Sequence, residues 1–186
     1  ILVLLLLLYI VVRNNQEKAE LVRSAQKDAL TGVYNRENTQ KVIDAILREK
    51  APEGFHGFLI LDMDHFKEVN DVYGHVMGDN VLRMLGGFLK EQFREQDVIG
   101  RIGGDEFVIL LCNIGSKENM ESRIKNLHEN LREIRMEGMG EYTFTFSAGI
   151  AFAPQDGDTF MELYQKADLA LYQVKRSGRD GYRIYK

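Results

Sequence analysis

Apolar residues recur along the chain with spacings that predict an ordered series of helices and strands. The apolar run at residues 58–63 carries an acid near its end, which indicates a buried strand that delivers a carboxylate. Residues 142–152 alternate like a second strand, and residues 182–185 predict an edge strand. Apolar positions at helical spacing predict helices at residues 14–27, around 42–47, and at 65–73, 79–93, 117–136 and 159–176.

The helix at 79–93 is expected to follow a turn at residues 74–78, with Asp79 as its N-cap. Gly86 and Gly87 lie inside this predicted helix. Each interior glycine costs about 1 kcal/mol relative to alanine. Close packing against a neighbouring element is the expected compensation.

Residues Arg101–Phe107 place two glycines and two adjacent carboxylates between apolar stretches, which predicts a hairpin tip. Glycines allow a tight turn and let a ligand approach the backbone closely. An ordinary surface hairpin whose acids face water is the alternative. With this hairpin, the order of elements is an α+β pattern with a mixed sheet, compatible with a ferredoxin-like βαββαβ core with additions. Acids at the strand ends would then meet on one rim.

The first twelve residues are wholly apolar and begin without Met. Spanning a bilayer takes roughly 20 apolar residues, so this segment is interpreted as the end of a transmembrane helix. Arg13 and Lys18 follow it, as expected of a cytoplasmic flank. A signal-peptide core or a buried helix is the alternative. The expected organisation is a membrane segment at 1–12, a juxtamembrane signalling helix at 13–27 and a folded domain at 28–186.

Composition narrows the function classes. The chain has 186 residues, 45% hydrophobic and 28% charged, which suits one domain with a single core. A net charge of -4 gives no broad basic surface, so we expect no nucleic-acid partner. Cys112 is the only cysteine, so disulfides within the chain are excluded and a buried inert thiol is expected.

Three carboxylates are candidates for chemistry. Asp62 ends the first strand, and Asp105 and Glu106 stand at the hairpin tip. Neighbouring strands could bring them within reach of one metal ion. Oxygen-only ligands select Mg²⁺ or Mn²⁺, which serve phosphoryl and nucleotidyl transfer.

Six ordered motifs together resemble the GGDEF family, the diguanylate cyclases, over about residues 26–186. They are Asp28–Arg36, Asp62–Lys67 with Asn70 and Asp71, Gly78-Asp79, Arg101–Phe107, Ser147–Ala151, and Ala170–Arg179. The resemblance implies an adenylyl-cyclase-like palm with a central, mostly antiparallel sheet surrounded by helices. It also implies condensation of two GTP into cyclic di-GMP with release of two pyrophosphates.

The resemblance also assigns roles to individual residues. Asp62, the Met63 carbonyl and Asp105 resemble the ligands of two Mg²⁺ or Mn²⁺ ions per active site, with Glu106 either also at the metal or assisting deprotonation. The expected substrate contacts are Lys67, Gly103, Gly104, Lys175 and Arg179 at the phosphates, and Asn70 and Asp79 at guanine. Lys175 and Arg179 share one helix face at i,i+4, although a solvated helix end gives the same pattern.

Arg94 and Asp97 match the family's Arg-x-x-Asp product-binding site, so product inhibition by cyclic di-GMP is expected there. Arg123 or Lys125 would complete that site. An exposed i,i+3 pair at a helix end is the alternative. Asp180 stands where Asn is common in the family, and its negative charge would weaken phosphate binding unless it faces solvent.

The resemblance implies a homodimer, because one monomer cannot complete a product made from two GTP. The expected location is a bacterial inner membrane with the catalytic domain in the cytoplasm. Two rival functions remain open: a module that binds GTP or cyclic di-GMP without turnover, and a cyclase that makes another nucleotide. Asp79 disfavours the second, because a carboxylate can accept two hydrogen bonds from guanine that adenine cannot donate.

Overall fold

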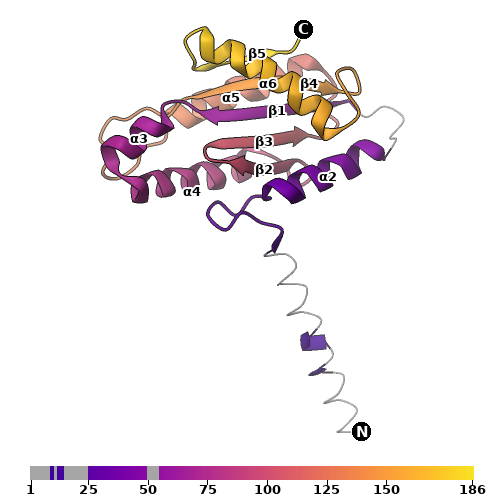
Figure 1. Cartoon of the computed structure of the whole chain (residues 1–186), viewed down its shortest axis with the longest axis horizontal. Helices are drawn as coiled ribbons and strands as arrows, with labels where there is room; N and C mark the ends of the chain where they lie inside the picture. The colour runs from indigo at the N-terminus through magenta and orange to yellow at the C-terminus, as the bar shows by residue number, and fades with distance from the viewer. Residues whose placement is uncertain (1–8, 11, 15–24, 50–54) are drawn as a thin grey trace.

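The computed structural model describes residues 9–10, 12–14, 25–49 and 55–186. Its centre is a five-stranded sheet in the order β2-β3-β1-β4-β5, with helices on both faces (Figure 1). The strands are β1 (His56–Met63), β2 (Val98–Gly103), β3 (Glu106–Leu111), β4 (Phe146–Ala153) and β5 (Gly181–Ile184). The helices are α2 (Arg36–Arg48), α3 (Phe66–Tyr73), α4 (His75–Gln92), α5 (Lys117–Arg132) and α6 (Phe160–Arg176).

The sheet is mixed and mostly antiparallel. β1 pairs antiparallel with β3 on one side and with β4 on the other, and β2 and β3 form the hairpin. β5 adds to β4 in parallel. The β1–β4 segment therefore has the βαββαβ order of a ferredoxin-like core, and the predicted α+β fold is confirmed.

Both faces of the sheet are buried, and alternate residues of each strand belong to different cores. Leu59 and Leu61 of β1 pack in a cluster with apolar residues of α4 and α5. Phe58 and Ile60 pack in a second cluster with residues of α2 and α6. This double burial explains why β1 and β3 appear in the sequence as continuous apolar runs.

Several predicted boundaries are wrong. α4 begins at His75 with Gly74 as its N-cap, so Asp79 lies inside the helix and does not cap it. Gly74 has φ +84°, and this left-handed residue separates α3 from α4. The first turn of α4 carries Val76, which is 78% exposed, so no apolar periodicity marks it. In addition, α5 ends at Arg132 and not at the predicted residue 136, and β4 begins at Phe146 and not at the predicted residue 142.

The two glycines inside α4 differ in their surroundings. A Cβ on Gly86 would lie 2.7 Å from the Cβ of Thr31 and 2.9 Å from its backbone oxygen. The expected close packing is therefore found at Gly86. A Cβ on Gly87 would meet no atom within 4 Å.

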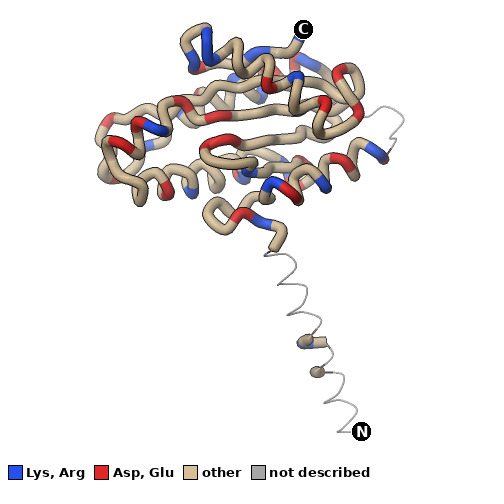
Figure 2. Tube along the Cα trace, in the orientation of Figure 1, with Lys and Arg blue, Asp and Glu red and all other residues tan. Residues whose placement is uncertain are grey.

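Most of the predicted N-terminal segments lies outside the described residues. Ala25 is helical, Gln26 is in a turn, and Lys27 forms an isolated bridge with Tyr34, so the predicted helix does not extend to Lys27. In the described part of the chain, every helix is too short or too polar to cross a lipid bilayer. Acidic and basic residues are interspersed over the described domain without a long tract of one sign (Figure 2).

Candidate active site

The three predicted carboxylates meet at one end of the sheet. Asp62 on β1 lies directly opposite Glu106 on β3, so both side chains project from the same face of the sheet. Asp105 occupies the turn between β2 and β3, and its backbone oxygen accepts a hydrogen bond from Met63 N at 3.4 Å. The predicted convergence of distant acidic segments is confirmed.

The hairpin tip leaves open space above its backbone. Gly104 has φ +54°, a conformation that side chains other than glycine rarely adopt. A Cβ on Gly103 or Gly104 would meet no atom within 4 Å. Arg101 Nε donates to the Gly104 oxygen at 2.8 Å, and the Arg101 guanidinium also contacts Asp28. The tip is therefore held by a side chain from β2 while its outer surface remains accessible.

Helix α6 supplies two contacts to the carboxylates because they point to its face of the sheet. Lys175 Nζ lies 2.7 Å from Asp62 Oδ2. The Tyr164 hydroxyl donates to Glu106 Oε1 at 2.7 Å. Lys175 thus offsets part of the negative charge, and Tyr164 fixes one oxygen of Glu106.

Acidic groups at this end of the sheet disfavour each other's ionisation. Burial and the neighbouring charge of Asp62 raise the pKa of Asp105. Burial likewise raises the pKa of Glu106, and Asp62 and Asp168 add to the effect. A cation bound here would relieve this repulsion.

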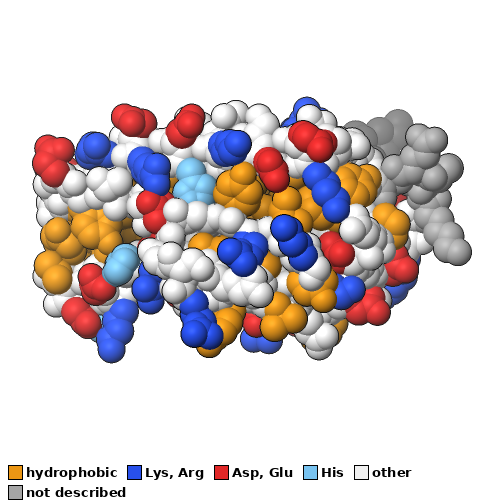
Figure 3. All heavy atoms as spheres, turned by 90° about the horizontal axis from the view of Figure 1, so that it is seen from above, with side chains coloured by type: hydrophobic (Ala, Val, Ile, Leu, Met, Phe, Trp, Pro, Cys, Tyr) orange, Lys and Arg blue, Asp and Glu red, His pale blue; other side chains and the backbone are white. Residues whose placement is uncertain are grey.

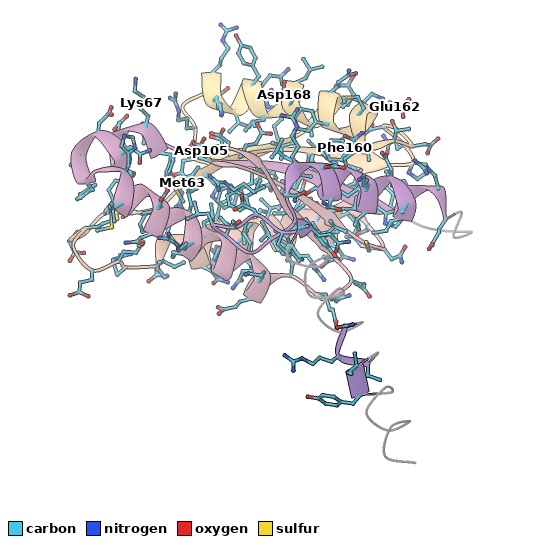
Figure 4. The ribbon with its side chains drawn as sticks, turned by 60° about the horizontal axis from the view of Figure 1, so that its bottom comes forward. Met63, Lys67, Asp105, Phe160, Glu162 and Asp168 are labelled. Atoms are coloured by element: carbon cyan, nitrogen blue, oxygen red, sulfur yellow. The ribbon has the colours of Figure 1, made fainter. Side chains whose placement is uncertain are left out.

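A cavity of about 320 Å³ adjoins the carboxylates. Its lining includes Asp62, Met63, Lys67, Asp105, Lys175 and Arg179. Figure 4 labels Met63 and Asp105 at the end of the sheet, with Lys67 on α3 beside them and Asp168 on α6. The structure thus brings the three predicted phosphate-binding cations to one cavity with two of the acids. This volume falls in the range of small-molecule sites.

The two residues predicted to bind guanine, Asn70 and Asp79, lie on the neighbouring helices α3 and α4. A Cβ on Gly78 would be only 2.0 Å from Asn70 Oδ1, so the Asn70 side chain lies directly against α4. Asp79 is the next residue and is exposed. Asn70 and Asp79 therefore lie at one helix junction, outside the residues that line the cavity.

The donor set suits a hard cation, although the protein does not preassemble a complete site. Among the described residues, no group of three or more His, Cys, Asp or Glu side chains is arranged to hold a metal ion. Carboxylate and carbonyl oxygens are the ligands Mg²⁺ prefers, and it is commonly held by one or two carboxylates together with substrate phosphates. The residues present therefore fit a metal ion that binds with a nucleotide.

Comparison with known families gives the same assignment. The family model described as "Diguanylate cyclase, GGDEF domain" matches residues 25–181. The chain belongs to the GGDEF family. The Gly103-Gly104-Asp105-Glu106-Phe107 run that names the family is the hairpin tip described above.

Relatives of this GGDEF domain include diguanylate cyclase DgcS of Shewanella oneidensis, 34% identical over 92% of this chain and 56% of the relative. Diguanylate cyclase TpbB of Pseudomonas aeruginosa is 33% identical over 92% of this chain and 40% of the relative. The chain thus spans about half the length of these relatives. The solved GGDEF domain of TpbB superposes with a TM-score of 0.81 at 32% identity, covering 86% of this chain and 94% of that one.

The Arg-x-x-Asp residues of the GGDEF domain lie between α4 and β2. The Asp97 side chain is 1% exposed and accepts hydrogen bonds from Arg94 N, from Cys112 N and from Arg123 at 3.5 Å. Asp97 therefore has a structural role, whereas the Arg94 side chain is exposed. Of the two cations expected to complete this site, Arg123 contacts Asp97, and Lys125 lines a different cavity with Arg132 and Asp180.

The Cys112 thiol, next to the backbone N–H that bonds to Asp97, is buried, as expected. Cys112 is 8% exposed, and burial raises the pKa of its thiol to about 11. The group is therefore protonated at neutral pH and is a weak nucleophile.

Sequence reasoning missed Asp64 and Tyr164. Asp64 is 3% exposed and accepts hydrogen bonds from Ser147 at 2.7 Å and from Thr145 at 3.0 Å. Its position two residues after Asp62 was the available signal. Tyr164 gave none, because an aromatic residue in an amphipathic helix usually indicates core packing.

A larger cavity, about 490 Å³, lies between α5, α6 and β5. Its lining includes Glu121, Gln173 and Tyr185 but none of the predicted site residues. On the face seen in Figure 3, hydrophobic side chains are interspersed with Lys and Arg.

Proposed function

We propose that this GGDEF domain is a diguanylate cyclase that condenses two GTP into cyclic di-GMP and releases two pyrophosphates. The observation that carries the proposal is the convergence of Asp62, Asp105 and Glu106 beside a cavity that three basic residues also line or approach. The names of the relatives support it, although this chain spans only about half of their length.

The basic residues at the cavity account for binding of a triphosphate. Lys67, Lys175 and Arg179 reach it from α3, from α6 and from the turn after α6. Arginine can bind a phosphate through two parallel hydrogen bonds, and lysine contributes a compact charge. Gly103 and Gly104 leave the hairpin backbone open to the phosphates.

Asn70 and Asp79 would select guanine. A carboxylate can accept hydrogen bonds from the ring N–H and the exocyclic amine of guanine together, and adenine presents no such pair. Gly78 allows Asn70 to lie against α4, next to Asp79. The two side chains can therefore contact one base edge.

We propose that Asp62, the Met63 carbonyl, Asp105 and Glu106 hold two Mg²⁺ or Mn²⁺ ions together with the GTP phosphates. Such ions would neutralise phosphate charge and favour the attacking alkoxide. The raised pKa values of Asp105 and Glu106 support this, because carboxylates that repel each other are stabilised in their ionised form beside a cation.

Bond formation joins the 3′-oxygen of one GTP to the α-phosphorus of the other, as the bond from that phosphorus to pyrophosphate breaks. Glu106 would accept the hydroxyl proton, and Tyr164 would orient Glu106 by its hydrogen bond to Oε1. The cleft binds one GTP, so two domains must face each other. The proposed assembly is a homodimer, and catalysis consists mainly of positioning and electrostatic stabilisation.

We propose in addition that cyclic di-GMP inhibits the enzyme by binding Arg94 beside the buried Asp97 and Arg123. In the Arg94→Ala variant, the inhibition constant for cyclic di-GMP should rise at least about tenfold, because a bidentate charged contact is removed. Turnover measured with product continuously removed should stay unchanged. Inhibition that persists in the variant would disprove this assignment.

The location of the protein is also a proposal. The apolar residues 1–12 followed by Arg13 and Lys18 favour a membrane segment with the GGDEF domain on the cytoplasmic side of a bacterial inner membrane. Residues 13–27 would then connect the two and carry a signal between them.

The proposed activity is tested by incubating the purified protein with GTP, ATP and Mg²⁺ and identifying the products by mass. Cyclic di-GMP from GTP, lost on chelation of the metal and in the Asp105→Asn variant, is the expected result. A module that only binds nucleotide would release no pyrophosphate. A cyclase of another specificity would give a monocyclic or adenine-containing product.

A further inference from the structure

The turn that carries Arg179 has an unusual backbone. Arg179 and Asp180 have φ values of +65° and +49°, so two consecutive residues other than glycine are left-handed. Side chains disfavour this conformation, so surrounding contacts must maintain it. The residue before them, Gly178, also has a positive φ of +114°.

Asp180 is held by one contact to its backbone and one to its side chain. Its backbone N–H donates to Asp64 Oδ2 at 3.0 Å. Its carboxylate lies 2.5 Å from Arg132 at the last turn of α5. The turn is therefore attached to the end of β1 through its backbone and to α5 through its side chain.

The attachment at Asp64 is rigid. The same carboxylate also accepts hydrogen bonds from the hydroxyls of Thr145 and Ser147, and Asp64 is 3% exposed. A buried, fully hydrogen-bonded carboxylate has little freedom to move. The attachment at Arg132 is the adjustable one, because the Arg132 and Asp180 side chains are 44% and 37% exposed.

His128 also lies near the Asp180 carboxylate, with Nδ1 at 3.6 Å from Oδ1. Its ring is stacked on Phe146 at 3.7 Å between centroids. Burial lowers the pKa of His128. Arg132 is therefore the cation that neutralises Asp180 at neutral pH, and the His128 ring packs beside the carboxylate.

This arrangement changes the interpretation of Asp180. The sequence suggested that an Asp at this position would weaken phosphate binding by its charge unless the side chain faced solvent. Instead, its charge is paired with Arg132 on the side of α5, while the preceding residue, Arg179, lines the cavity with Lys175.

We propose that Asp180, through its ion pair with Arg132, is a positioning residue that fixes the backbone at Arg179 so that the guanidinium is available to the substrate phosphates. The inference rests on the proposed function, in which Arg179 binds the phosphates of GTP. Neither Asp180 nor Arg132 touches the substrate. Both act by keeping the turn in its left-handed conformation.

The test compares four variants. Asp180→Ala and Arg132→Ala should each raise the KM for GTP about tenfold while kcat changes less than about twofold. The reason is that a small displacement of Arg179 weakens binding of the GTP phosphates in the ground state and the transition state alike. The double variant should show no further increase, because both changes break one interaction. Asp180→Asn should restore KM to within about threefold of wild type, because Asn tolerates the left-handed conformation and can accept a hydrogen bond from Arg132.

Lys41→Ala is the matched control. It removes an exposed ion pair with Glu37 on α2, distant from the cleft, and should leave KM unchanged. Thermal unfolding of each variant reports whether it is folded. If Asp180→Ala does not fold, the KM of Arg132→Ala still decides the question.

The wild-type protein separates this inference from the proposed function. If the wild-type protein neither binds a non-hydrolysable GTP analogue nor releases pyrophosphate, the proposed function itself fails. If the wild-type protein is active and both Asp180→Ala and Arg132→Ala keep the wild-type KM, only the positioning role is overturned. Additive increases in the double variant would also overturn it.

Discussion

Gly78 is the residue at which α3 and α4 come close enough for the Asn70 side chain to lie against the next helix. A Cβ there would approach Asn70 Oδ1 to 2.0 Å and Phe66 to 3.4 Å. Its φ is not left-handed, so the glycine serves close approach and not backbone conformation. Gly78 therefore provides the surface on which Asn70 lies, and Asp79 follows it directly. Asn70 and Asp79 are the two residues proposed to bind guanine.

Gly78→Ala should consequently reduce guanine recognition without unfolding α4. The new methyl group displaces Asn70, and we expect kcat/KM for GTP to fall about tenfold, comparable to loss of one base-specific hydrogen bond. Gly87→Ala is the control in the same helix, where a Cβ meets no atom within 4 Å. That variant should gain roughly 0.5–1 kcal/mol of stability and retain wild-type kinetics. Equal kinetics in both variants would show that the Asn70 position does not matter.

Asp105 illustrates how a carboxylate proposed to bind a metal ion lowers stability. Because its pKa is raised in the folded protein, its contribution to stability is fully present below the unfolded-state pKa and is lost as pH rises through the folded-state pKa. The ionised group therefore destabilises the metal-free protein at neutral pH.

Asp105→Asn should then abolish activity but raise the free energy of unfolding at pH 7 by roughly 0.5 kcal/mol in buffer with a chelator. The gain should vanish at about pH 4, near the reference pKa of Asp, where the wild-type group binds its proton. Thermal unfolding at the two pH values measures this difference. Asp62→Asn is the comparison: it breaks the 2.7 Å contact with Lys175 and should give no gain. A less stable Asp105→Asn variant at pH 7 would contradict the argument.

At the scale of elements, α6 is positioned by its close approach to β4. A Cβ on Gly149 would lie 1.9 Å from the Ala167 oxygen and 2.5 Å from Leu171 N, both backbone atoms. Backbone atoms cannot move away as a flexible side chain can. Since α6 carries Tyr164 and Lys175, this contact determines how both reach the carboxylates.

Gly149→Ala should therefore displace α6 as a unit. We expect a loss of about 3 kcal/mol in the free energy of unfolding, typical of forced overpacking, together with reduced activity. Denaturant unfolding measures the loss. A control at the sheet's hairpin, Gly103→Ala, adds a methyl group to open space and should change stability by less than about 0.5 kcal/mol. Similar stability of the two variants would contradict the close-approach argument.

Elements with strong apolar periodicity could be predicted from the sequence, and their ends could not. The core positions of β1 and α6 follow from their patterns, but the start of α4 depends on the left-handed Gly74, and its first turn exposes Val76. β4 begins at Phe146, four residues after its predicted start, because alternation in the sequence does not reveal where pairing with β1 ends. Boundaries depend on tertiary partners that a local pattern does not contain.

At the scale of the whole molecule, the candidate site depends on contacts between segments far apart in sequence. The carboxylates could be predicted because each stands in a motif. The partners of Asp64 could not, since Thr145, Ser147 and the Asp180 amide lie 81 to 116 residues away. Sequence thus identified the groups proposed to act on the substrate, and the fold identified the groups that hold them.

The start of the domain contacts the hairpin tip through the Asp28 side chain. Asp28 accepts hydrogen bonds from the Thr31 backbone and hydroxyl at 2.9 and 2.6 Å and pairs with Arg101 at 3.1 Å. Arg101 in turn donates to the Gly104 oxygen at 2.8 Å. Burial opposes ionisation of Asp28, but the hydrogen bonds from Thr31 and Arg101 outweigh it and lower its pKa. A displacement of Asp28 would therefore reach the turn that holds Asp105 through the Arg101 side chain.

Asp28→Asn should lower kcat about tenfold, because Arg101 loses its charged partner and holds the Gly104 turn less firmly. Thr31→Val is the matched control, because it removes the hydroxyl donor to Asp28 and keeps the Asp28–Arg101 ion pair. It should lower the free energy of unfolding by about 1 kcal/mol. Its kcat should stay within about twofold of wild type. Steady-state kinetics and thermal unfolding of both variants separate the two effects. If both lose stability equally and neither loses turnover, the Asp28–Arg101 contact is structural only. Selective loss of turnover in Asp28→Asn would mean that the N-terminal segment can regulate the geometry of the hairpin, and so the enzyme, without touching the substrate.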